Sequence, residues 1–301
     1  MSTQTHKAPD STSTAAAAVR PNKTRSIAIG EARPQRWLYL TLGLGLVVML
    51  TPFAWMVLSS LKPEAEIREN PPTWWPKTFT LENFTELFTR LDFPQFFTNS
   101  AVVAVFVTLG NLVFCSMLGY AFAKIDFWGR DWLFRIVLGT MMIPGIVMLV
   151  PLFVLVSRLG LVNSYAGLIL PFLAGPFGVF LMRQFISALP DELIDAGRID
   201  GASEFRIFAR IIMPLCKPAL ATLGILTFLG SWNNFLWPLV VASSEEKYTL
   251  PVALALYSVG QNENQYGLML AGAVAVVVPV LVVFLFLQKQ IIQGIATTGI
   301  K

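Results

Sequence analysis

The sequence predicts an all-helical membrane protein that crosses the bilayer six times. Of its 301 residues, 55% are hydrophobic and only 13% are charged, and the mean hydropathy is +0.63. Soluble domains carry about 25% charged residues, so this composition is typical of a chain surrounded by lipid. Uncharged stretches recur between Trp37 and Leu287. Most of them reach the length of about 20 residues that a helix needs to span a bilayer.

These stretches place six spans in one membrane domain over residues 37–301. The spans are expected at 37–60, 101–123, 136–156, 165–182, 219–242 and 267–287. Several contain a proline, which removes a backbone donor and kinks a helix, either as a tolerated irregularity or as a hinge beside a pathway. Residues 1–36 are rich in Ser, Thr, Ala and Pro and cannot bury enough apolar surface to fold. We therefore expect a disordered tail there.

The distribution of basic residues orients the chain. An even number of spans puts both termini on one side of the membrane. With that side cytoplasmic, 16 of the 22 Lys and Arg residues lie inside, as the positive-inside rule requires. We therefore expect both termini, and the 1–36 tail, in the cytoplasm.

Acidic residues and histidine are absent from the predicted span cores. All 18 Asp and Glu residues fall in tails, loops or helix edges, whereas a proton-coupled carrier keeps ionisable groups at membrane depth. The single histidine, His6, lies in the tail, which excludes serine–histidine hydrolysis and most zinc chemistry. There is no Gly-x-x-x-x-Gly-Lys phosphate loop and no Lys/Arg-rich stripe for nucleic acid. The chain has no predicted catalytic, metal or cofactor site, so any pumping needs energy from a partner.

A polar interval at residues 183–218, between the fourth and fifth predicted spans, carries the pattern of two short helices joined by a turn. Pro190 precedes two acidic residues, which is typical of a helix start. The Asp200-Gly201 pair predicts the turn, because glycine adopts a positive φ at little cost. In the second helix apolar residues recur at i, i+3, i+4 and i+7, namely Phe205, Phe208, Ala209 and Ile212. From periodicity alone, an amphipathic loop lying on lipid headgroups fits as well.

The stretch LPDELIDAGRIDGASEFRIFARIIMPLCKP resembles the cytoplasmic E-A-A-x-x-x-G loop of binding-protein-dependent ABC importer permeases. Asp195, Ala196 and Gly197 stand at the E-A-A positions, Gly201 stands at the glycine, and Met213-Pro214 stands at a downstream Leu-Pro. Two positions depart from the family pattern. Asp195 shortens the usual carboxylate by one methylene, and Gly197 in place of alanine costs a helix interior roughly 0.5–1 kcal/mol.

Further segments resemble the carbohydrate-uptake branch of these permeases, in particular the smaller maltose-type subunit. They are Asn83-Phe84, Asn99-Ser100, GSWNNFLWPL at 230–239, YTLPVAL at 248–254 and QGIATTGIK at 293–301. The resemblance implies a permease subunit that is not itself an enzyme and that forms half of a sugar pathway. The implied partners are a second similar permease, two subunits that bind ATP and Mg²⁺, and an extracytoplasmic solute-binding protein.

The resemblance also implies roles for particular residues. A helix-turn-helix loop at about 187–214 would dock on the ATPase and transmit its closure to the spans. The residues expected to carry this coupling are Asp195, Ala196, Gly197, Asp200, Gly201, Phe205, Phe208 and Pro214.

Candidates for the substrate pathway come from polar and aromatic residues at membrane depth, namely Trp232, Asn233, Asn234, Trp237 and Asn111. Asn233 and Trp237 are four residues apart and are expected on one helical face, where an amide beside an indole suits a sugar. The competing interpretations are packing against a partner permease and, for Asn111, a bridging hydrogen bond. In the last external loop, Glu245, Glu246, Tyr248 and Glu263 face either a binding protein or solvent.

Two other functions remain open. The same machine would serve equally for a polyol or glycerol phosphate, because the predicted coupling loop does not contact the cargo. A stand-alone secondary carrier or a membrane enzyme is disfavoured, since the spans lack carboxylates and histidine.

Overall fold

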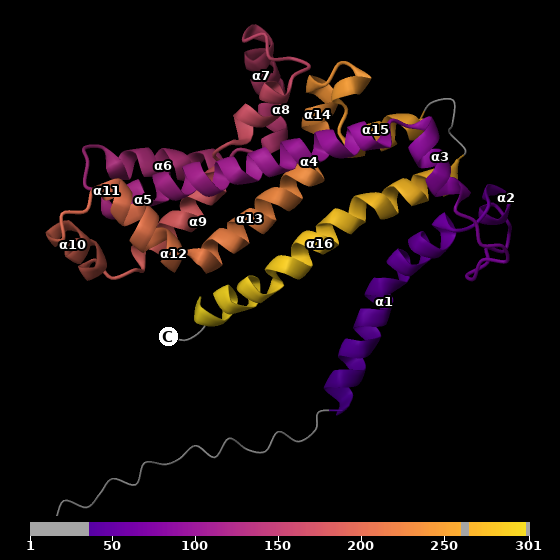
Figure 1. Cartoon of the computed structure of the whole chain (residues 1–301), viewed down its shortest axis with the longest axis horizontal. Coiled ribbons are helices and arrows are strands. Elements are labelled where there is room, and N and C mark those ends of the chain that lie inside the picture. Colours follow the sequence, from indigo (N-terminus) through magenta and orange to yellow (C-terminus); the bar gives the residue numbers. More distant parts are fainter. Residues whose placement is uncertain (1–35, 260–264, 299–301) are drawn as a thin grey trace, which may run out of the picture. The chain divides into compact units, whose positions relative to one another are not determined.

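The computed structural model describes residues 36–259 and 265–298, and every regular element in these ranges is a helix. The chain divides into two compact units, Met1–Met49 and Leu50–Lys301, each of which is described by itself. Residues 1–35 of the predicted tail, and its His6, lie outside the described residues, as do Glu263 and the last three residues of the QGIATTGIK segment. The elements are drawn in Figure 1. In chain order they are α1 (Arg36–Ser60), α2 (Glu64–Ile67), α3 (Glu82–Arg90), α4 (Phe93–Gly110), η1 (Asn111–Cys115), α5 (Ser116–Lys124), α6 (Arg130–Met141), α7 (Gly145–Arg158), α8 (Tyr165–Ile169), η2 (Leu170–Phe172), α9 (Pro176–Ser187), α10 (Glu192–Ile199), α11 (Glu204–Ile207), η3 (Phe208–Ile212), α12 (Met213–Leu215), α13 (Lys217–Trp232), α14 (Leu236–Val241), η4 (Glu245–Lys247), α15 (Leu250–Val259) and α16 (Tyr266–Thr298).

The described residues contain four helical runs that are long and apolar enough to cross a membrane, and up to six if each of two bent pairs counts as one span. The four runs are Trp37–Ser60, Phe93–Lys124, Tyr165–Ser187 and Tyr266–Phe286. They agree with the first, second, fourth and sixth predicted spans. The prediction of an all-helical membrane protein is confirmed.

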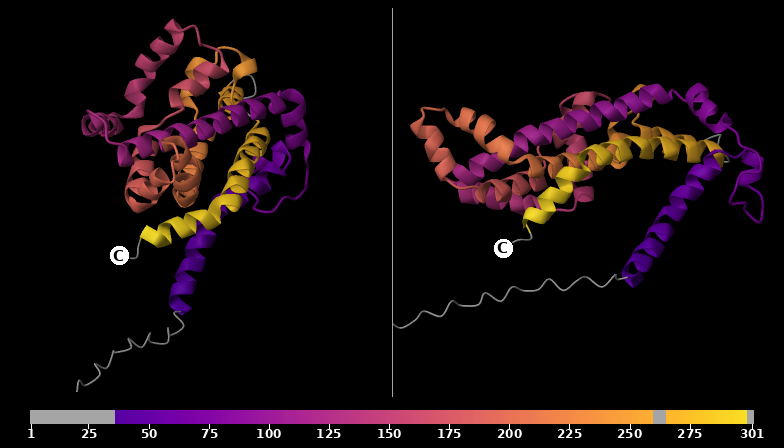
Figure 2. Two further views of the ribbon diagram at one scale, coloured as in Figure 1. Left: turned by 60° about the vertical axis from the view of Figure 1, so that its left-hand side comes forward. Right: turned by 60° about the horizontal axis from the view of Figure 1, so that its bottom comes forward.

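The predicted span 136–156 is wrong as a continuous helix. Helix α6 ends at Met141 and α7 begins at Gly145, and the two are bent by 106°. Pro144 takes an extended conformation immediately before α7, because proline has no backbone N–H with which to continue a helix. The left view of Figure 2 shows α7 turned away from α6.

The predicted span 219–242 is interrupted as well. Helix α13 ends at Trp232 and α14 begins only at Leu236, and the side-chain oxygen of Asn234 accepts a hydrogen bond from the Trp237 N–H at 3.3 Å. Asparagine side chains compete with the helical ladder in this way. The helical stretch that forms a bent candidate span together with α13 is Glu204–Leu215, which precedes α13 in the chain. The bend between the two is 82°.

In the unit Leu50–Lys301, α4, η1 and α5 form one long run against which α9 and α13 pack (Figure 1). The backbones of α5 and α9 approach closely at Gly119 in α5, where a Cβ would lie 2.7 Å from Cβ of Met182 in α9. Without a hydrophobic force between helices in lipid, association depends on such close packing of small residues. Met182 and its neighbour Ile186 are fully buried in the resulting core.

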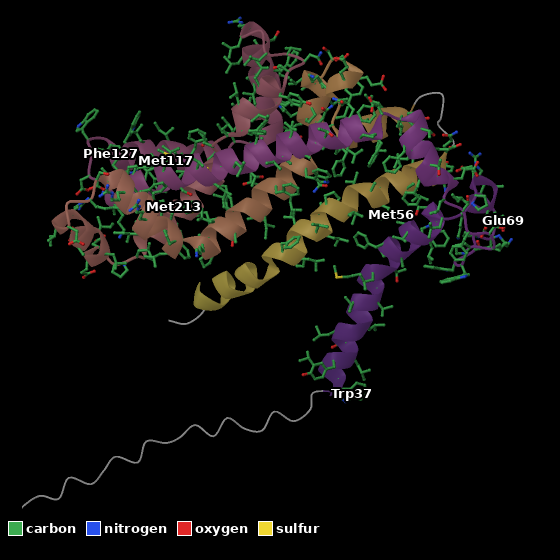
Figure 3. The ribbon with its side chains drawn as sticks, in the orientation of Figure 1. Trp37, Met56, Glu69, Met117, Phe127 and Met213 are labelled. Atoms are coloured by element: carbon green, nitrogen blue, oxygen red, sulfur yellow. The ribbon has the colours of Figure 1, made fainter. Side chains whose placement is uncertain are left out.

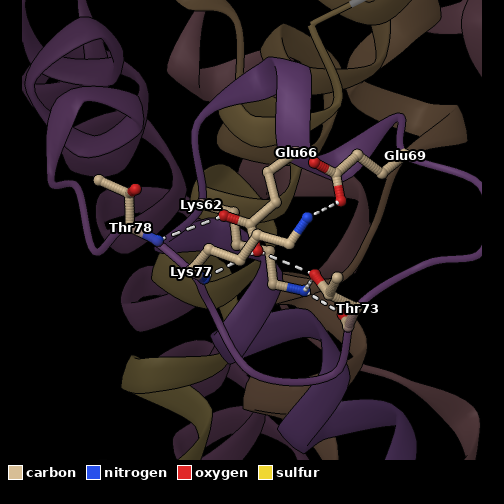
Figure 4. Close-up of polar contacts among 6 residues, drawn as sticks. All are labelled: Lys62, Glu66, Glu69, Thr73, Lys77 and Thr78. Carbon is tan, nitrogen blue, oxygen red and sulfur yellow. Dashed lines mark hydrogen bonds and ion pairs between the residues drawn. The ribbon is translucent and has the colours of Figure 1, made fainter.

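A second packed region lies in the loop after α1, where charged residues are buried. Lys62 is 1% exposed and Glu66 is 6% exposed. The Glu66 carboxylate accepts hydrogen bonds from Thr73 Oγ1 at 2.8 Å and the Lys77 N–H at 2.9 Å, and the Lys62 ammonium donates to the Thr73 carbonyl (Figure 4). The Lys77 N–H is the main cause that lowers the pKa of Glu66. Composition gave no sign of this network, because it requires residues from both ends of a loop.

The predicted motif residue Asn83 has a structural role beside that network. Its amide Nδ2 donates to the carbonyls of Ser60 and Lys62, each at 2.8 Å. Glu64 accepts hydrogen bonds from the N–H groups of Tyr266 at 3.2 Å and Gly267 at 2.9 Å, which satisfies the first donors of α16. The start of α16 is thereby attached to the loop that follows α1.

The close approach at Gly119 generates a matched prediction. Gly119→Ala forces the added methyl against Met182 and is expected to cost about 1–3 kcal/mol of stability. Gly139→Ala in α6 is the control, because nothing lies within 4 Å of a Cβ built there. Thermal unfolding of the purified variants in detergent measures both. Equal melting temperatures for the two variants would contradict the packing described.

Candidate functional site

The α10–α11 segment, residues 187–214, folds as two short helices around a glycine turn. The Gly201 N–H donates to the Arg198 carbonyl and the Ala202 N–H donates to the Gly197 carbonyl, both at 3.0 Å. Gly201 has a φ of +75°. These bonds form the Schellman arrangement that ends a helix with a left-handed residue. The turn predicted at Asp200-Gly201 is therefore confirmed.

Helix α11 begins at a capped serine and widens into a π turn. Ser203 Oγ accepts a hydrogen bond from the Arg206 N–H at 3.4 Å. The buried face consists of Ile207, Phe208 and Ile212. Of the predicted apolar stripe, Phe205 and Ala209 are exposed, whereas Phe208 and Ile212 are buried. The π turn η3 at Phe208–Ile212 shifts the phase of the side chains relative to a regular helix.

Gly197 explains one departure from the family pattern. A Cβ at this position would lie 3.0 Å from Cδ1 of Ile211 and 3.1 Å from Cγ1 of Ile207. The glycine therefore lets α10 pack closely on the isoleucines that follow it. Glycine destabilises a helix interior relative to alanine, and the close packing of α10 on the isoleucines offsets this cost.

Glu204 joins both short helices to the end of α5. Its carboxylate accepts a hydrogen bond from Tyr120 Oη at 2.7 Å and one from Arg198 Nε at 2.8 Å. Tyr120 is 4% exposed, and its ring lies 5.5 Å from that of Phe208. The Glu204 carboxylate raises the pKa of the Arg198 guanidinium. Sequence reasoning missed Glu204, because Tyr120 lies 84 positions away in the chain.

A second contact attaches the start of α10 to the same end of α5. The Lys124 ammonium donates to the Leu189 carbonyl and to the Asp191 carboxylate, both at 2.6 Å. The Lys124 side chain is only 5% exposed, whereas the Asp191 side chain is 77% exposed and remains in contact with water. Both ends of α10 are thus bound to elements of the membrane-spanning bundle.

The outer surface of the α10–α11 segment carries exposed apolar side chains. Ile199 is 86% exposed and Phe205 is 67% exposed. The remaining predicted coupling residues on this surface are Asp195, Ala196, Asp200 and Pro214, which are exposed. Of the predicted pair of phenylalanines, only Phe205 is free to touch another protein, whereas Phe208 packs in the core.

A cavity of about 720 Å³ lies where the helix breaks of this unit meet. Its walls come from α4 and η1, from the α6–α7 bend, from the α8–α9 junction, and from α13 and α14. The polar side chains among the lining residues are Asn111, Thr140, Thr227, Ser231, Asn234 and Trp237. No Asp, Glu, Lys, Arg or His is among them.

Asn111 holds two cavity walls together. Its Nδ2 donates to the Phe172 carbonyl at 2.6 Å, and its Oδ1 accepts from the Gly175 N–H at 3.0 Å. The Phe172 carbonyl and the Gly175 N–H both lie between α8 and α9, where the run Tyr165–Ser187 departs from a regular α-helix. Backbone groups there lack the usual hydrogen-bond partners within a helix. The bridging hydrogen bond considered from the sequence is therefore what Asn111 makes.

The tryptophans predicted for the pathway are packing residues. Trp232 is 2% exposed, donates to the Val276 carbonyl at 3.0 Å and stacks on Phe228. Trp237 is 3% exposed and donates to the Gly167 carbonyl at 3.1 Å. Both indole rings therefore pack within this chain.

Asn233 and Trp237 do not share a helical face, because the chain leaves the helix between them. Asn233 is exposed and donates only to the Leu229 carbonyl of its own helix among the contacts described. Of the predicted pathway residues, Asn111, Asn234 and Trp237 line the cavity. Sequence reasoning missed the cavity residues Thr227 and Ser231. Their spacing of four residues on α13, with Asn234 three residues later, was the signal that could have found them.

The loop before α15 is held at the opposite end of this unit from the α10–α11 segment. Asn99 Nδ2 donates to the carbonyls of Glu246 and Tyr248, and Asn163 Oδ1 accepts from the N–H groups of Ser243 and Ser244. Glu245 and Glu246 are exposed there. Figure 3 shows Met213 and Phe127 at the end that bears α10 and Glu69 at the other end.

The geometry is that of a helical bundle with a tethered helix pair at one end and an uncharged cavity within. Residues 115–295 match the family model for the "Binding-protein-dependent transport system inner membrane component". The chain belongs to this family. The match includes the whole α10–α11 segment, and it confirms the resemblance stated from the sequence motifs.

Relatives of this permease cover most of its length. The arabinooligosaccharides transport system permease protein AraQ of Halalkalibacterium halodurans is 42% identical over 270 residues, which cover 88% of this chain and 96% of the relative. The trehalose/maltose transport system permease protein MalG of Thermococcus litoralis is 32% identical over 259 residues, covering 85% of this chain and 92% of that one. A solved chain of a bacterial ABC transporter involved in alginate import superimposes with a TM-score of 0.77 at 25% identity, covering 84% of this chain and 95% of its own.

Asn111 supports a prediction about the permease bundle. Asn111→Leu leaves the Phe172 carbonyl and the Gly175 N–H without their partner, and the expected cost is about 1–3 kcal/mol. Asn233→Leu is the matched control, because its exposed amide bonds only within its own helix. Thermal unfolding in detergent should show a lower melting temperature for the first variant alone. An unchanged melting temperature for Asn111→Leu would exclude the bridging role.

Proposed function

We propose that this chain is the permease subunit of an ATP-driven importer of a sugar or oligosaccharide, in which it forms half of the translocation pathway and is moved by a separate ATPase. The observation that carries the proposal is the attachment of the α10–α11 segment to α5 through Glu204. The bundle offers no ionisable group in its cavity to use a proton gradient. Force from a partner is the remaining source of work.

The α10–α11 segment is the docking element for that ATPase. Apolar side chains as exposed as Ile199 and Phe205 are costly in water and favour burial in a partner's groove. Asp195 lies on the same helix as Ile199 with its carboxylate exposed and 3.4 Å from Nη1 of Arg198, and in the proposed contact it exchanges this long ion pair for one with a basic residue of the ATPase. Ala196, Asp200 and Pro214 complete the contact surface.

Displacement of the docked segment reaches the cavity along one continuous path. A movement of the segment is passed to α5 through the hydrogen bonds of Glu204 to Tyr120 and of Asp191 to Lys124. Helix α5 follows directly on η1, which begins at Asn111 in the cavity wall. Helix shifts of this kind are a common means of coupling distant sites. Gly197 and Gly201 set the angle between the short helices, and Phe208 transmits their position to Tyr120 by packing.

We place the α10–α11 segment and both termini in the cytoplasm, with six spans in the inner membrane. Support comes from the basic residues, most of which fall on that side. The hydrogen bonds are consistent with this topology. Lys124 and Tyr120 bond to the α10–α11 segment, whereas Asn99 and Asn163 bond to the loop before α15.

The complete importer contains further subunits. A second homologous permease supplies the other half of the pathway, and two ATPase subunits bind ATP and Mg²⁺, so that this chain itself needs no cofactor. An extracytoplasmic solute-binding protein delivers the cargo, as the family's description indicates. The exposed Glu245 and Glu246 on the loop before α15 form part of its docking surface.

The turn at Gly201 provides the test of coupling. Gly201→Val strains a left-handed residue, so the two helices lose their angle and uptake should fall at least tenfold. Gly160→Val is the matched control, because Gly160 also has a positive φ, +68°, and equally open surroundings, but it lies in the loop between α7 and α8. ATP hydrolysis and solute uptake are measured together in proteoliposomes that contain the complete importer.

Both variants should insert in the membrane at similar levels. Only Gly201→Val is expected to lose ATPase association or the ratio of uptake to hydrolysis. Normal transport by Gly201→Val would refute the proposed coupling. Loss of transport by both variants would show that strain alone is responsible.

The cargo is tested on the cognate binding protein, where selection takes place. Calorimetry with arabinotriose, maltose, lactose and sn-glycerol 3-phosphate should give heat of binding with at least one saccharide and none with the phosphate ester. A protein that binds only sn-glycerol 3-phosphate would replace the sugar assignment by the polyol phosphate alternative. The permease assignment would be unaffected.

A further inference from the structure

The cavity beside α13 is lined by apolar side chains and a few uncharged polar ones. It holds about 720 Å³, large enough for a sugar, and no ionisable side chain lines it. Ligand cavities of roughly 300–1,000 Å³ combine apolar walls with a few polar groups that fix the ligand's orientation. Here those groups are uncharged hydroxyls and amides.

Three of the polar groups form a line along one side of the cavity. Thr227 and Ser231 are four residues apart on α13, and Asn234 follows three residues later, so all three face the cavity together with Gly230. Glycine at this position leaves the wall open between the polar groups. Helix α13 stops at Trp232, so Asn234, the third polar group, lies in the segment after the helix.

These polar groups retain hydrogen-bonding capacity. Thr222, on the same helix, donates its hydroxyl to the Pro218 carbonyl at 3.0 Å, as hydroxyls in membrane helices commonly do. The hydroxyls of Thr227 and Ser231 and the Nδ2 group of Asn234 have no such partner among the described residues. A polar group at membrane depth without a partner is costly, and a solute rich in hydroxyl groups would satisfy all three.

We infer that this cavity is a binding subsite for an uncharged, polyhydroxylated solute, with Thr227, Ser231 and Asn234 as its hydrogen-bonding groups. The inference rests on the proposed function and deepens it by naming the class of cargo and the residues that touch it. An anionic cargo such as a phosphate ester would find no compensating cation among the residues of this chain that line the cavity, and leaving a buried charge unpaired is costly. The apolar lining residues, among them Leu149 and Phe172, contact the C–H faces of the sugar rings.

The experiment uses the complete importer in proteoliposomes with its binding protein present in excess. The probes are radiolabelled arabinotriose, maltose and lactose as neutral saccharides and sn-glycerol 3-phosphate as the charged comparison. The double variant Thr227→Val/Ser231→Ala removes two hydroxyls with little change of volume. Thr222→Val is the matched control, because it removes a hydroxyl from the same helix but outside the cavity.

The double variant should transport the accepted saccharide at least fivefold more slowly per ATP hydrolysed, since each hydrogen bond to a neutral group is worth a few-fold in occupancy. Its ATP hydrolysis, and co-purification of the other subunits, should stay within twofold of the unmodified importer. Thr222→Val should match the unmodified importer in every measurement. A failure of coupling would appear instead as lost ATPase association, so the two proposals fail in different readouts.

A second variant tests access to the cavity. In an importer whose other subunits carry no cysteine, Ser231→Cys should react with N-ethylmaleimide and thereby lose uptake. The same importer with the native Ser231 should keep its uptake, because Cys115 and Cys216 are 0% exposed. Normal uptake by the double variant or by the modified Ser231→Cys importer overturns the inference. So does loss of the partner permease from the double variant, or transport of the phosphate ester in place of every saccharide.

Discussion

The carboxylate of Glu204 is the constraint on which the rest of this permease depends. It is the single acceptor that the phenol of Tyr120 in α5 and the guanidinium of Arg198 in α10 share. Hydrogen bonds that involve a charged group are among the stronger ones in proteins, and Tyr120 is buried. In the proposed coupling, a helix pair held in this way moves with the bundle, and an external force on the pair displaces α5.

The interior of the bundle is arranged to receive that displacement. Helix α5 packs against α9 at Gly119 with almost no intervening side chain, so the two helices cannot slide independently. Asn111 then connects the same run to backbone groups freed at the α8–α9 junction. Irregular backbone is tolerated at membrane depth where it lines a cavity or is satisfied by neighbours, and both conditions are met here.

The helix breaks and the cavity share a cause. Pro144 separates α6 from α7, and the amides after Trp232 end α13 before α14 begins. Each break turns the chain away from its neighbours and leaves space that side chains do not fill. The cavity is therefore a consequence of interrupted spans, and its uncharged lining follows from the absence of ionisable residues in those spans.

Local sequence determined the helical class, the positions of four membrane-length runs, the left-handed turn at Gly201 and the family, because each depends on composition or on residues within a few positions. Tertiary structure decided which polar residues matter. Trp232 was expected in a pathway and is buried against α16, whereas Thr227 and Ser231 were overlooked and line the cavity. The contact between Glu204 and Tyr120 joins residues 84 positions apart, and no local pattern encodes such a pairing. The physical reason is that hydropathy records how much surface a segment buries, but the choice of partner is made only when the helices pack.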